Sequence, residues 1–390
     1  MKILAVLPRF PYPLDKGDKL RAFHQLRLLS QNHDIYLFCT SEQAVREAEM
    51  DEVKKFCKEI HVVRTNKMGC LFNAALALIC GGSLQVGYWN SCRTRKAYRR
   101  FEQKVQPDAV YCQMVRTMPW VRRSKCYKVL DFQDALSLNT KRRMDRSHGL
   151  MRLLLKYEYK ALQKAEQRAL EAFDATTVIS QIDQRHLSPK TVIVPNGVDT
   201  EYFNRQAIPQ SSSKYTIVFC GNMSYAPNVD AAQYLVNDVL PIVRKHTQDA
   251  TLLIAGADPK AAVRSLASTN VTISGRLSDI RTAYASSCIF VAPMRIGSGL
   301  QNKLLEAMSM GLPCVTTTLA NTPLGAASGE SVLVGDTPQE LAKIIVDLVS
   351  DSEKRERISE NGLRFIKDHY SWPAAVAPLE HLFYAKLESK

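Results

Sequence analysis

The segment from Ala292 to Val315 reads APMRIGSGLQNKLLEAMSMGLPCV. A short apolar run precedes the glycine loop Gly297–Gly299, and a helical stretch then leads through Gly311 to a second apolar run. This order predicts strand, loop, helix, turn and strand, a unit typical of parallel α/β sheets. Lys303 and Glu306 are three residues apart and therefore share one face of the expected helix. An anionic ligand would bind at the end of that helix nearest the glycines.

The same alternation of short apolar runs and helical stretches continues along the chain, with one interruption. Residues 206–214 contain a proline and three consecutive serines and form the best candidate linker. We therefore expect two doubly wound α/β domains, at residues 1–205 and 215–370. In such folds ligands bind at the carboxyl ends of the strands, which predicts a site in a cleft between the domains.

Composition limits the class of protein and its partners. The 390 residues are 46% hydrophobic and 23% charged, as in soluble globular proteins. A net charge of +14 favours an acidic partner, such as nucleic acid, an anionic membrane surface or a phosphorylated substrate. The ten scattered cysteines are typical of free thiols in a reducing compartment. No signal peptide or run of ~20 apolar residues is present. We expect a cytoplasmic chain, or one attached to the cytosolic face of a membrane.

Met68–Cys80, MGCLFNAALALIC, is nearly all apolar. Taken alone, a segment of this length predicts a buried helix, with a membrane-facing helix as the alternative. With the three basic runs of the first domain, peripheral contact with an anionic membrane becomes an equally good alternative. The runs are Arg93–Lys104, Arg122–Lys128 and Lys141–Arg146.

The opening segment has the groups that a nucleoside diphosphate requires. Its glycines allow close backbone approach, and a helix beginning near Leu300 would present free N–H groups. Arg295 and Lys303 add positive charge for a diphosphate, and Glu306 can accept hydrogen bonds from two ribose hydroxyls. We assign the catalytic role to these three side chains. Arg276, which follows a strand end, is expected beside the base, and the remaining donor-binding candidates are Ser298, Gly299, Leu300, Gln301 and Asn302.

Several motifs resemble those of retaining GT-B glycosyltransferases of the large family four, the glycosyl transferases group 1. Glu306–Val315, EAMSMGLPCV, resembles the family's Glu-Ala-Met-Ala-x-Gly-x-Pro-Val motif. Pro293–Lys303 is most similar to the subgroup of sugar transferases associated with exopolysaccharide and exosortase gene clusters. Val194–Asp199 resembles the end of the family's first domain, and Phe219–Asn228 resembles the start of its second. Ser371-Trp372 resembles the segment from which a last helix, here 371–390, crosses back to the first domain.

This resemblance implies the GT-B fold, with two Rossmann-like domains and an interdomain cleft, and a retaining transferase of the hexosyltransferase type. The co-substrate would be a nucleotide-diphosphate sugar, with no cofactor, and the acceptor a glycan or polyprenyl-linked molecule in surface polysaccharide biosynthesis. The resemblance adds Gly17, Gly221 and Asn222 to the donor-binding candidates. The acceptor-side candidates are Asp18, Gln133 and Asp134.

Three positions depart from the family pattern. Ser298 stands where many relatives have the first Glu of Glu-x7-Glu, and Asn222 and Met223 stand where many have Arg and Lys. Gln133 replaces the family's histidine. The phosphate charge must then be met by Arg295 and Lys303. Asp18 is equally well explained as an N-cap of the helix that follows it.

No Asp-x-Asp motif occurs in the chain. This predicts metal-independent transfer in which Arg295, Lys303 and the helix N-terminus stabilise the leaving diphosphate. The alternatives are a nucleotide-sugar epimerase on the same scaffold and a non-catalytic anion- or nucleic-acid-binding protein. The epimerase would need acid/base side chains that the sequence does not identify, and only the net charge favours nucleic acid. A dinucleotide oxidoreductase is set aside because Pro8–Pro11 replaces Gly-x-Gly-x-x-Gly after the first strand.

Overall fold

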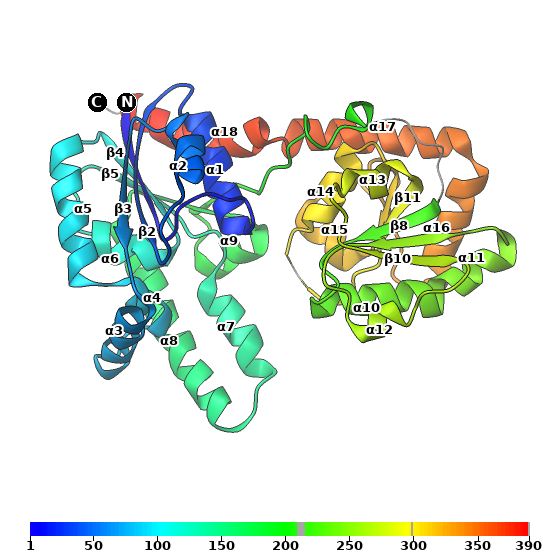
Figure 1. Ribbon diagram of the computed structural model, residues 1–390, viewed down its shortest axis with the longest axis horizontal. Helices are drawn as coiled ribbons and strands as arrows, with labels where there is room; N and C mark the ends of the chain where they lie inside the picture. The colour runs from blue at the N-terminus through cyan, green and yellow to red at the C-terminus, as the bar shows by residue number, and fades with distance from the viewer. Residues whose placement is uncertain (209–214, 298, 389–390) are drawn as a thin grey trace. The chain divides into compact units, whose positions relative to one another are not determined.

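The chain folds into two compact units, each built around one parallel sheet (Figure 1). The computed structural model describes residues 1–208, 215–297 and 299–388. Unit 1 comprises Met1–Pro195 together with Ala375–Lys390, and unit 2 comprises Asn196–Ala374.

The sheet of unit 1 has seven parallel strands in the order β3-β2-β1-β4-β5-β6-β7. The central strands β1 and β4 are apolar along almost their whole length, as expected where helices cover both faces of a sheet. The strands are β1 Lys2–Leu7, β2 Asp34–Ser41, β3 Glu59–Arg64, β4 Ala109–Gln113, β5 Tyr127–Asp131, β6 Ala175–Val178 and β7 Val192–Ile193.

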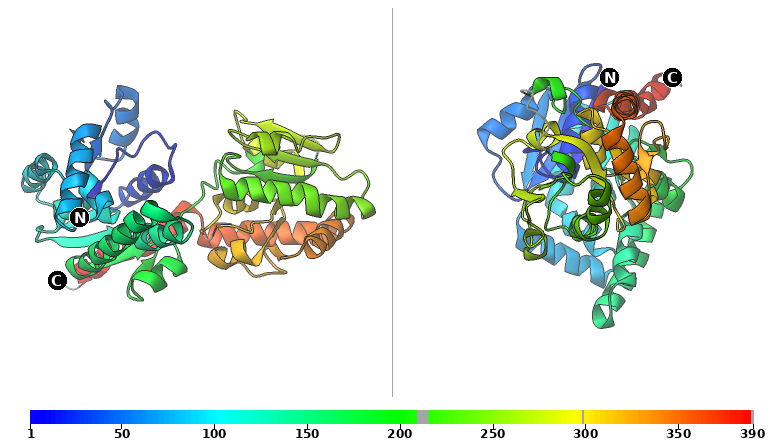
Figure 2. Two further views of the ribbon diagram at one scale, coloured as in Figure 1. Left: turned by 90° about the horizontal axis from the view of Figure 1, so that it is seen from below. Right: turned by 90° about the vertical axis from the view of Figure 1, so that its right-hand side faces the viewer.

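Helices connect these strands, and several begin at a side-chain cap. Asn66, Ser83 and Ser91 each accept a hydrogen bond from a backbone N–H three residues later, the usual N-cap arrangement. The helices α7 and α8 pack against each other as a hairpin (Figures 1 and 2). The helices are α1 Gly17–Leu29, α2 Glu47–Lys54, α3 Lys67–Ile79, α4 Leu84–Trp89, α5 Cys92–Val105, α6 Met118–Val121, α7 Leu136–Asp145, α8 Gly149–Ala172, α9 Gln181–Leu187 and α18 Trp372–Glu388, whose first three residues belong to unit 2.

The sheet of unit 2 has six parallel strands in the order β10-β9-β8-β11-β12-β13. Its strands are β8 Tyr215–Cys220, β9 Leu252–Ala255, β10 Val271–Gly275, β11 Ser287–Ala292, β12 Cys314–Thr316 and β13 Leu333–Val334. Its helices are α10 Ala226–Tyr234, a π-helical turn Leu235–Val239, α11 Leu240–His246, α12 Ala261–Arg264, α13 Arg281–Ala285, α14 Asn302–Ser309, α15 Thr318–Leu324, α16 Pro338–Ser350 and α17 Ser352–His369. The predicted α/β class with two parallel sheets is therefore confirmed.

The division between the units precedes the predicted linker. Residues 196–208 pack with unit 2, because the Val198 N–H donates to the Tyr370 carbonyl at 2.7 Å and Ser309 Oγ donates to the Phe203 carbonyl at 2.7 Å. The prediction had assigned residues 196–205 to the first domain. Of the predicted linker 206–214, positions 209–214 lie outside the described residues.

The prediction that Met68–Cys80 is a buried helix is wrong. In α3 only Cys70 is buried, while Phe72 is 67% and Ile79 is 83% exposed. The helix turns its small residues toward α4, where a Cβ on Gly87 would lie 2.3 Å from the Cβ of Ala77. Close packing of small residues leaves the large apolar side chains outside. Within the described ranges, no helix is long and apolar enough to cross a bilayer.

Candidate donor site and acceptor-side residues

The candidate donor site lies at the carboxyl edge of the unit 2 sheet, where the loops after its parallel strands meet. The loops after β8 and β9 touch through their backbones, because the Gly221 N–H donates to the Ala255 carbonyl at 3.0 Å. A Cβ on Gly256 would lie 1.7 Å from the Gly221 carbonyl oxygen, and Gly256 has φ +144°. Only glycine fits there, so the backbones at Gly221 and Gly256 stay in contact beside the loop that follows β11.

Lys303, the second residue of α14, is a partly dehydrated cation. Its Nζ donates to Asn228 Oδ1 and lies 5.2 Å from the centroid of the Phe219 ring. Burial lowers the pKa of Lys303 to about 8. Within the described part of the chain, no carboxylate forms an ion pair with it. The carboxylate of Glu306 acts on this charge without forming an ion pair, so an anionic ligand would find a cation with no ion-pair partner at the start of α14.

Glu306 lies one turn further along α14 and is held by Tyr284 of α13. The Tyr284 hydroxyl donates to Glu306 Oε2 at 2.8 Å, and Tyr284 is fully buried. Burial raises the pKa of Glu306 to about 7, opposed by the Tyr284 hydrogen bond and the charge of Lys303. No described residue donates a hydrogen bond to Oε1, which remains able to accept one from a ligand.

Arg295 follows β11, as expected, but its charge is already matched. Its Nε and Nη2 donate to the two carboxylate oxygens of Asp230 at 3.1 and 2.7 Å, and the guanidinium lies 4.1 Å from the centroid of the Tyr234 ring. The side chain is 46% exposed. Asp230 and Tyr234 both belong to α10, so Arg295 is fixed to that helix. Of the two predicted phosphate cations, Lys303 is thus the one free to attract an anion.

The loop before α14 is open, as a ligand-binding loop requires. Gly297 has φ +100°, and a Cβ on Gly299 would meet nothing within 4 Å. Gln301 Nε2 donates to the Gly299 carbonyl at 2.8 Å. The predicted Ser298 lies outside the described residues.

The helix itself begins slightly later than the sequence predicted. It starts at Asn302 rather than near Leu300, because the Leu300 side chain packs against the core of unit 2. No side chain caps this terminus at Gln301. The Leu304 N–H donates to the Gln301 carbonyl at 2.9 Å, and no described residue accepts from the N–H groups of Asn302 and Lys303, which can therefore bind an anion.

The remaining donor-side candidates are spread along the same edge. Asn222 Oδ1 accepts from the Ser224 N–H at 2.8 Å, and the Asn222 carbonyl accepts from Asn228 Nδ2 at 2.9 Å. This places Asn222 beside the partner of Lys303. Arg276 follows the edge strand β10 and lies 3.9 Å from Asp258, with both side chains largely exposed. The structure therefore brings Gly221 and Asn222 to the Lys303 cluster and leaves Arg276 at the margin of the sheet.

In unit 1, Gly17 and Asp18 open α1 beyond the end of β1. Asp18 Oδ2 pairs with Arg9 Nη1 at 2.8 Å, and the Asp18 carbonyl accepts from Gln113 Nε2 at 3.0 Å. The N-cap of α1 is Lys16, so the interpretation of Asp18 as an N-cap is wrong. A Cβ on Gly17 would meet nothing within 4 Å, which leaves its backbone accessible.

Gln133 and Asp134 follow β5 and are positioned by Asp131. This buried carboxylate accepts two hydrogen bonds from Arg21, at 2.7 and 3.1 Å, and one from the Gln133 N–H at 3.1 Å. Gln133 has φ +62°, and its buried Nε2 has no partner among the described residues. Asp134 is exposed, yet the protein around its carboxyl group desolvates it and, with the carboxylate of Asp183, raises its pKa to about 6. An acceptor hydroxyl near Gln133 would meet an unused donor and a titratable carboxylate.

One family of known proteins matches a segment in the second half of the chain. Residues 214–351 match the family described as Glycosyl transferases group 1. This segment is a glycosyltransferase domain. It contains all the donor-side candidates except Gly17, whereas the acceptor-side candidates lie outside it.

The resemblance to proteins over greater lengths supports the same class. The chain is 23% identical over 385 residues to an uncharacterised 44.6 kDa protein in the cps region of Klebsiella pneumoniae, covering 95% of this chain and 96% of that protein. It is 27% identical over 227 residues to a GDP-mannose-dependent monoacylated α-(1-6)-phosphatidylinositol monomannoside mannosyltransferase of Corynebacterium glutamicum, covering 51% of this chain and 59% of the relative. The structure of HepE from Anabaena in complex with UDP matches over 100% of both chains, with a TM-score of 0.66 and 14% identity. Such structural similarity shows the GT-B fold. The predicted fold and the predicted enzyme class, glycosyltransferase, are both confirmed.

Sequence reasoning missed three side chains that organise the glycosyltransferase domain: Tyr284, Asn228 and Asp230. Asn228 closes the Phe219–Asn228 motif and could have been selected from it. Tyr284 and Asp230 carry no motif, because their roles depend on α13 and α10 packing beside β11 and α14. Within the described ranges, no group of three or more His, Cys, Asp or Glu side chains could hold a metal ion.

Proposed function

We propose that this glycosyltransferase is a retaining, metal-independent enzyme of the hexosyltransferase type, with a nucleotide-diphosphate sugar as donor and no cofactor. The observation that carries the proposal is the pair formed by Lys303 and Glu306. Among the described residues, a cation without an ion-pair partner and a carboxylate with one oxygen that accepts no hydrogen bond lie one turn apart beside an open glycine loop. A positive charge suits a diphosphate, and a carboxylate oxygen suits a ribose hydroxyl.

Each side chain has a distinct role in this proposal. Lys303 and the uncapped N–H groups of α14 attract the diphosphate, and Glu306 Oε1 accepts a hydrogen bond from a ribose hydroxyl. Tyr284 holds the carboxylate through Oε2. The UDP bound to Anabaena HepE and the GDP-mannose dependence of the Corynebacterium mannosyltransferase support a nucleotide-diphosphate sugar as donor.

Leaving-group stabilisation is the main chemical contribution of the site. Negative charge develops on the diphosphate as its bond to the sugar breaks, and a preorganised ammonium and helix terminus stabilise that charge. Arg295 contributes to the same field, reduced by its pairing with Asp230. With retention, the acceptor hydroxyl attacks the face that the diphosphate leaves, and its proton passes to the departing phosphate. These protein cations supply the positive charge without a metal ion.

We further propose a glycan or polyprenyl-linked acceptor in surface polysaccharide biosynthesis, and a peripheral position on the cytosolic face of a membrane. The similarity to a cps-region protein over nearly the whole chain supports the polysaccharide role. The exposed apolar face of α3 and the basic surface of unit 1 support the membrane position.

The direct test is a transfer assay with UDP-, GDP- and ADP-sugars, performed with EDTA and a polyprenyl-diphosphate-linked sugar acceptor. The proposal predicts product with the donor's anomeric configuration, determined by NMR, and its loss in Glu306→Gln. Glu330→Gln, at an exposed position of the same unit, is the matched control and should keep full activity. An inverted product would refute retention, and dependence on added metal would refute metal independence. Conversion of the donor sugar without acceptor would indicate the epimerase instead.

A further inference from the structure

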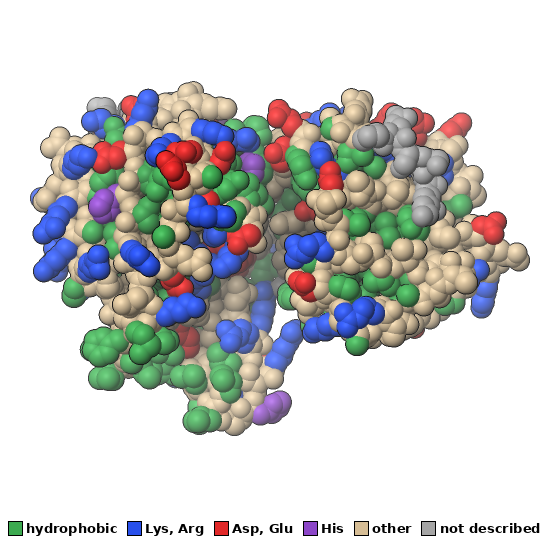
Figure 3. Space-filling model, in the orientation of Figure 1, with side chains coloured by type: hydrophobic (Ala, Val, Ile, Leu, Met, Phe, Trp, Pro, Cys, Tyr) green, Lys and Arg blue, Asp and Glu red, His purple; other side chains and the backbone are tan. Residues whose placement is uncertain are grey.

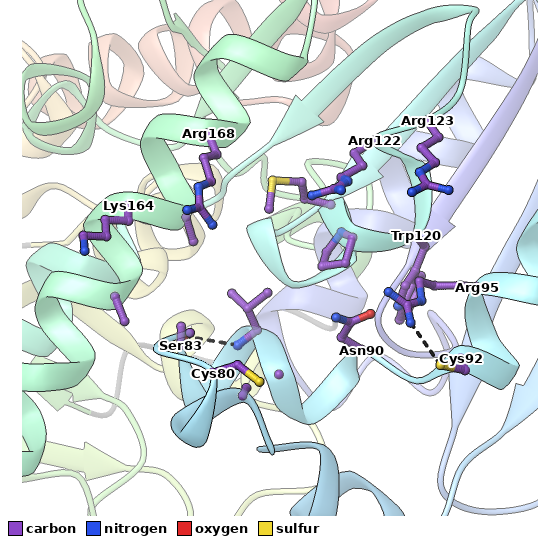
Figure 4. Close-up of a pocket in the computed structure, with 18 of the residues that line it drawn as sticks. Cys80, Ser83, Asn90, Cys92, Arg95, Trp120, Arg122, Arg123, Lys164 and Arg168 are labelled. Atoms are coloured by element: carbon purple, nitrogen blue, oxygen red, sulfur yellow. Dashed lines mark hydrogen bonds between the residues drawn. The ribbon is translucent and has the colours of Figure 1, made fainter. Parts of the chain in front are cut away.

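A pocket in unit 1 lies beside the short crossover between β4 and β5. The crossover from β4 to β5 carries only a 3₁₀ turn, Val115–Thr117, and the four-residue α6, whereas the neighbouring α5 and α8 have 14 and 24 residues. The pocket has a volume of about 570 Å³ and is bounded by α4, α5, α6, α8 and the end of α3 (Figure 4).

The walls of this pocket are strongly cationic. Figure 4 shows Arg95, Arg122 and Arg123 on one side and Lys164 and Arg168 of α8 on the other. No aspartate or glutamate lines the pocket, and within the described ranges none of its basic side chains forms an ion pair. Like charges gathered without counter-charges repel one another, so an anionic ligand would stabilise the arrangement. The basic lining residues are Arg95, Lys96, Arg99, Arg122, Arg123, Lys164 and Arg168.

The floor of the pocket is apolar with one unused polar atom. Trp120 lies there with its Nε1 donating to the Trp89 carbonyl at 3.1 Å. Asn90 Oδ1 is buried and has no hydrogen-bond partner among the described residues. Glu158, behind Ser83, does not line the pocket, and its carboxylate accepts from Ser83 Oγ at 2.7 Å and from the Leu84 N–H at 2.8 Å. The floor thus suits a ligand that carries a hydroxyl beside its anionic group.

An exposed apolar surface adjoins the pocket. The end of α3 forms its rim through Ala77 and Cys80, and the Tyr157 hydroxyl of α8 donates to the Gly82 carbonyl at 3.0 Å. Figure 3 shows hydrophobic side chains gathered at the end of unit 1 where α3 and the α7–α8 hairpin project. The exposed members of this surface are Met68, Leu71, Phe72, Leu76, Leu78 and Ile79 of α3 and Leu150, Met151, Leu153 and Leu154 of α8.

We propose that the cationic pocket binds the phosphate group of an anionic membrane phospholipid while the apolar faces of α3 and the first turn of α8 enter the lipid interface. The two features require one partner that is both anionic and apolar. A nucleic acid would satisfy the cations but leave the apolar side chains in water. A bilayer with acidic headgroups satisfies both.

This inference rests on the peripheral membrane position proposed above and assigns the residues responsible for it. It is independent of the donor site in unit 2. A failure of membrane binding would therefore leave the donor assignment intact, and loss of nucleotide binding would leave the pocket assignment intact.

The test is flotation of the full chain with vesicles of phosphatidylcholine, with and without phosphatidylglycerol. The pocket variant Arg95→Ser/Lys164→Ser is compared with Arg100→Ser/Lys160→Ser, which removes the same charge from exposed positions of the same two helices outside the pocket. We expect the wild type to float only with phosphatidylglycerol. The pocket variant should partition on the order of tenfold less, and the control less than twofold less.

A second variant tests the apolar part. Phe72→Ser/Ile79→Ser alters two exposed side chains, so it should fold normally and lose binding at physiological salt, where screening weakens the remaining electrostatic attraction. Equal losses in the pocket variant and its control would overturn the assigned pocket, because only net charge would then matter. The phospholipid assignment would also be overturned if the chain bound glycerol phosphate or an oligonucleotide but did not float with the vesicles.

Discussion

The Tyr284 hydroxyl donates a hydrogen bond to Glu306 Oε2 at 2.8 Å, linking a buried residue of α13 to the half-buried carboxylate of α14. This contact orients the carboxylate and leaves its second oxygen unused. The carboxylate is therefore preorganised to accept a hydroxyl of the donor.

Replacement of Tyr284 by phenylalanine tests this preorganisation. A hydrogen bond to a charged group contributes about 1.5–3 kcal/mol, so Tyr284→Phe should weaken nucleoside diphosphate binding on the order of tenfold or more. Isothermal titration calorimetry measures the change. The control is Tyr225→Phe, at an exposed position of the same unit, which should bind normally. Unchanged affinity in Tyr284→Phe would show that Glu306 needs no positioning.

Lys303 and Arg295 should contribute unequally to nucleotide binding. Lys303→Met removes a cation that has no ion-pair partner among the described residues. It should cost more affinity than Arg295→Gln, because the Arg295 charge is already paired with Asp230. Because burial disfavours the ammonium, Lys303→Met should keep or raise the melting temperature while it abolishes binding. Nucleotide titration and thermal unfolding of both variants give the comparison. A larger loss in Arg295→Gln would reverse the assigned order.

Nucleotide affinity should depend on pH through the same two side chains. Glu306, with a pKa of about 7, is protonated below neutrality and loses acceptor capacity there, so affinity should fall as the pH drops below about 7. Lys303, with a pKa of about 8, loses its charge above that value, so the affinity should fall again in alkali. A bound diphosphate favours the charged ammonium and therefore moves this fall to higher pH. Titrations at several pH values test the profile. In Glu306→Gln the affinity should no longer fall as the pH drops below about 7. If the same fall remains in this variant, it comes from protonation of the nucleotide's own phosphate.

The same shifts predict the pH dependence of stability. The pKa of Glu306 is raised on folding, so the native state binds more protons between its unfolded and folded pKa values, and stability falls as the pH rises through that interval toward about 7. The pKa of Lys303 is lowered, so the unfolded state binds more protons above about 8, and stability rises there. Thermal unfolding at several pH values measures both effects. Glu306→Gln should lose the fall in stability toward pH about 7, and Lys303→Met should lose the rise above about 8.

In unit 1, the buried pair of Arg21 and Asp131 should be essential for stability. Asp131→Asn leaves the Arg21 guanidinium, which is 1% exposed, without its carboxylate, and breaking a buried pair costs about 3–5 kcal/mol. Chemical denaturation measures the loss. Asp51→Asn, which breaks an exposed pair with Lys54, is the control and should change the free energy of unfolding by less than about 1 kcal/mol. Equal effects would mean that Asp131 is not a structural centre.

The sequence predicted the strands and the donor-side motif better than it predicted tertiary contacts. Strands such as β4 and β8 are nearly continuous apolar runs between polar segments, so the sequence indicates them directly. The motif from Arg295 to Glu306 lies at a carboxyl edge because strand, loop and helix are local in sequence. Tyr284 and Asp230 were missed because their contacts join elements that are separate in the chain.

The α3 helix is a second place where the prediction and the structure differ. Apolar composition indicated burial, but the small residues Cys70, Ala74 and Ala77 occupy the inward face, while Phe72 and Ile79 point outward. Composition alone does not distinguish a helix that buries large side chains from one that presents them. The division of the chain near Pro195 was also missed, since the hydrogen bonds that tie 196–208 to unit 2 are long-range.

The most direct measurement is calorimetric titration of UDP, GDP and ADP into the wild type and Glu306→Gln, both in EDTA. The account predicts that one diphosphate binds the wild type without metal and that Glu306→Gln binds it about ten- to a hundredfold more weakly, because a hydrogen bond to a charged group contributes about 1.5–3 kcal/mol. Both proteins should unfold at similar temperatures. Absence of binding by every diphosphate, or equal affinity in the two proteins, would contradict the assignment of Lys303 and Glu306 as the donor site.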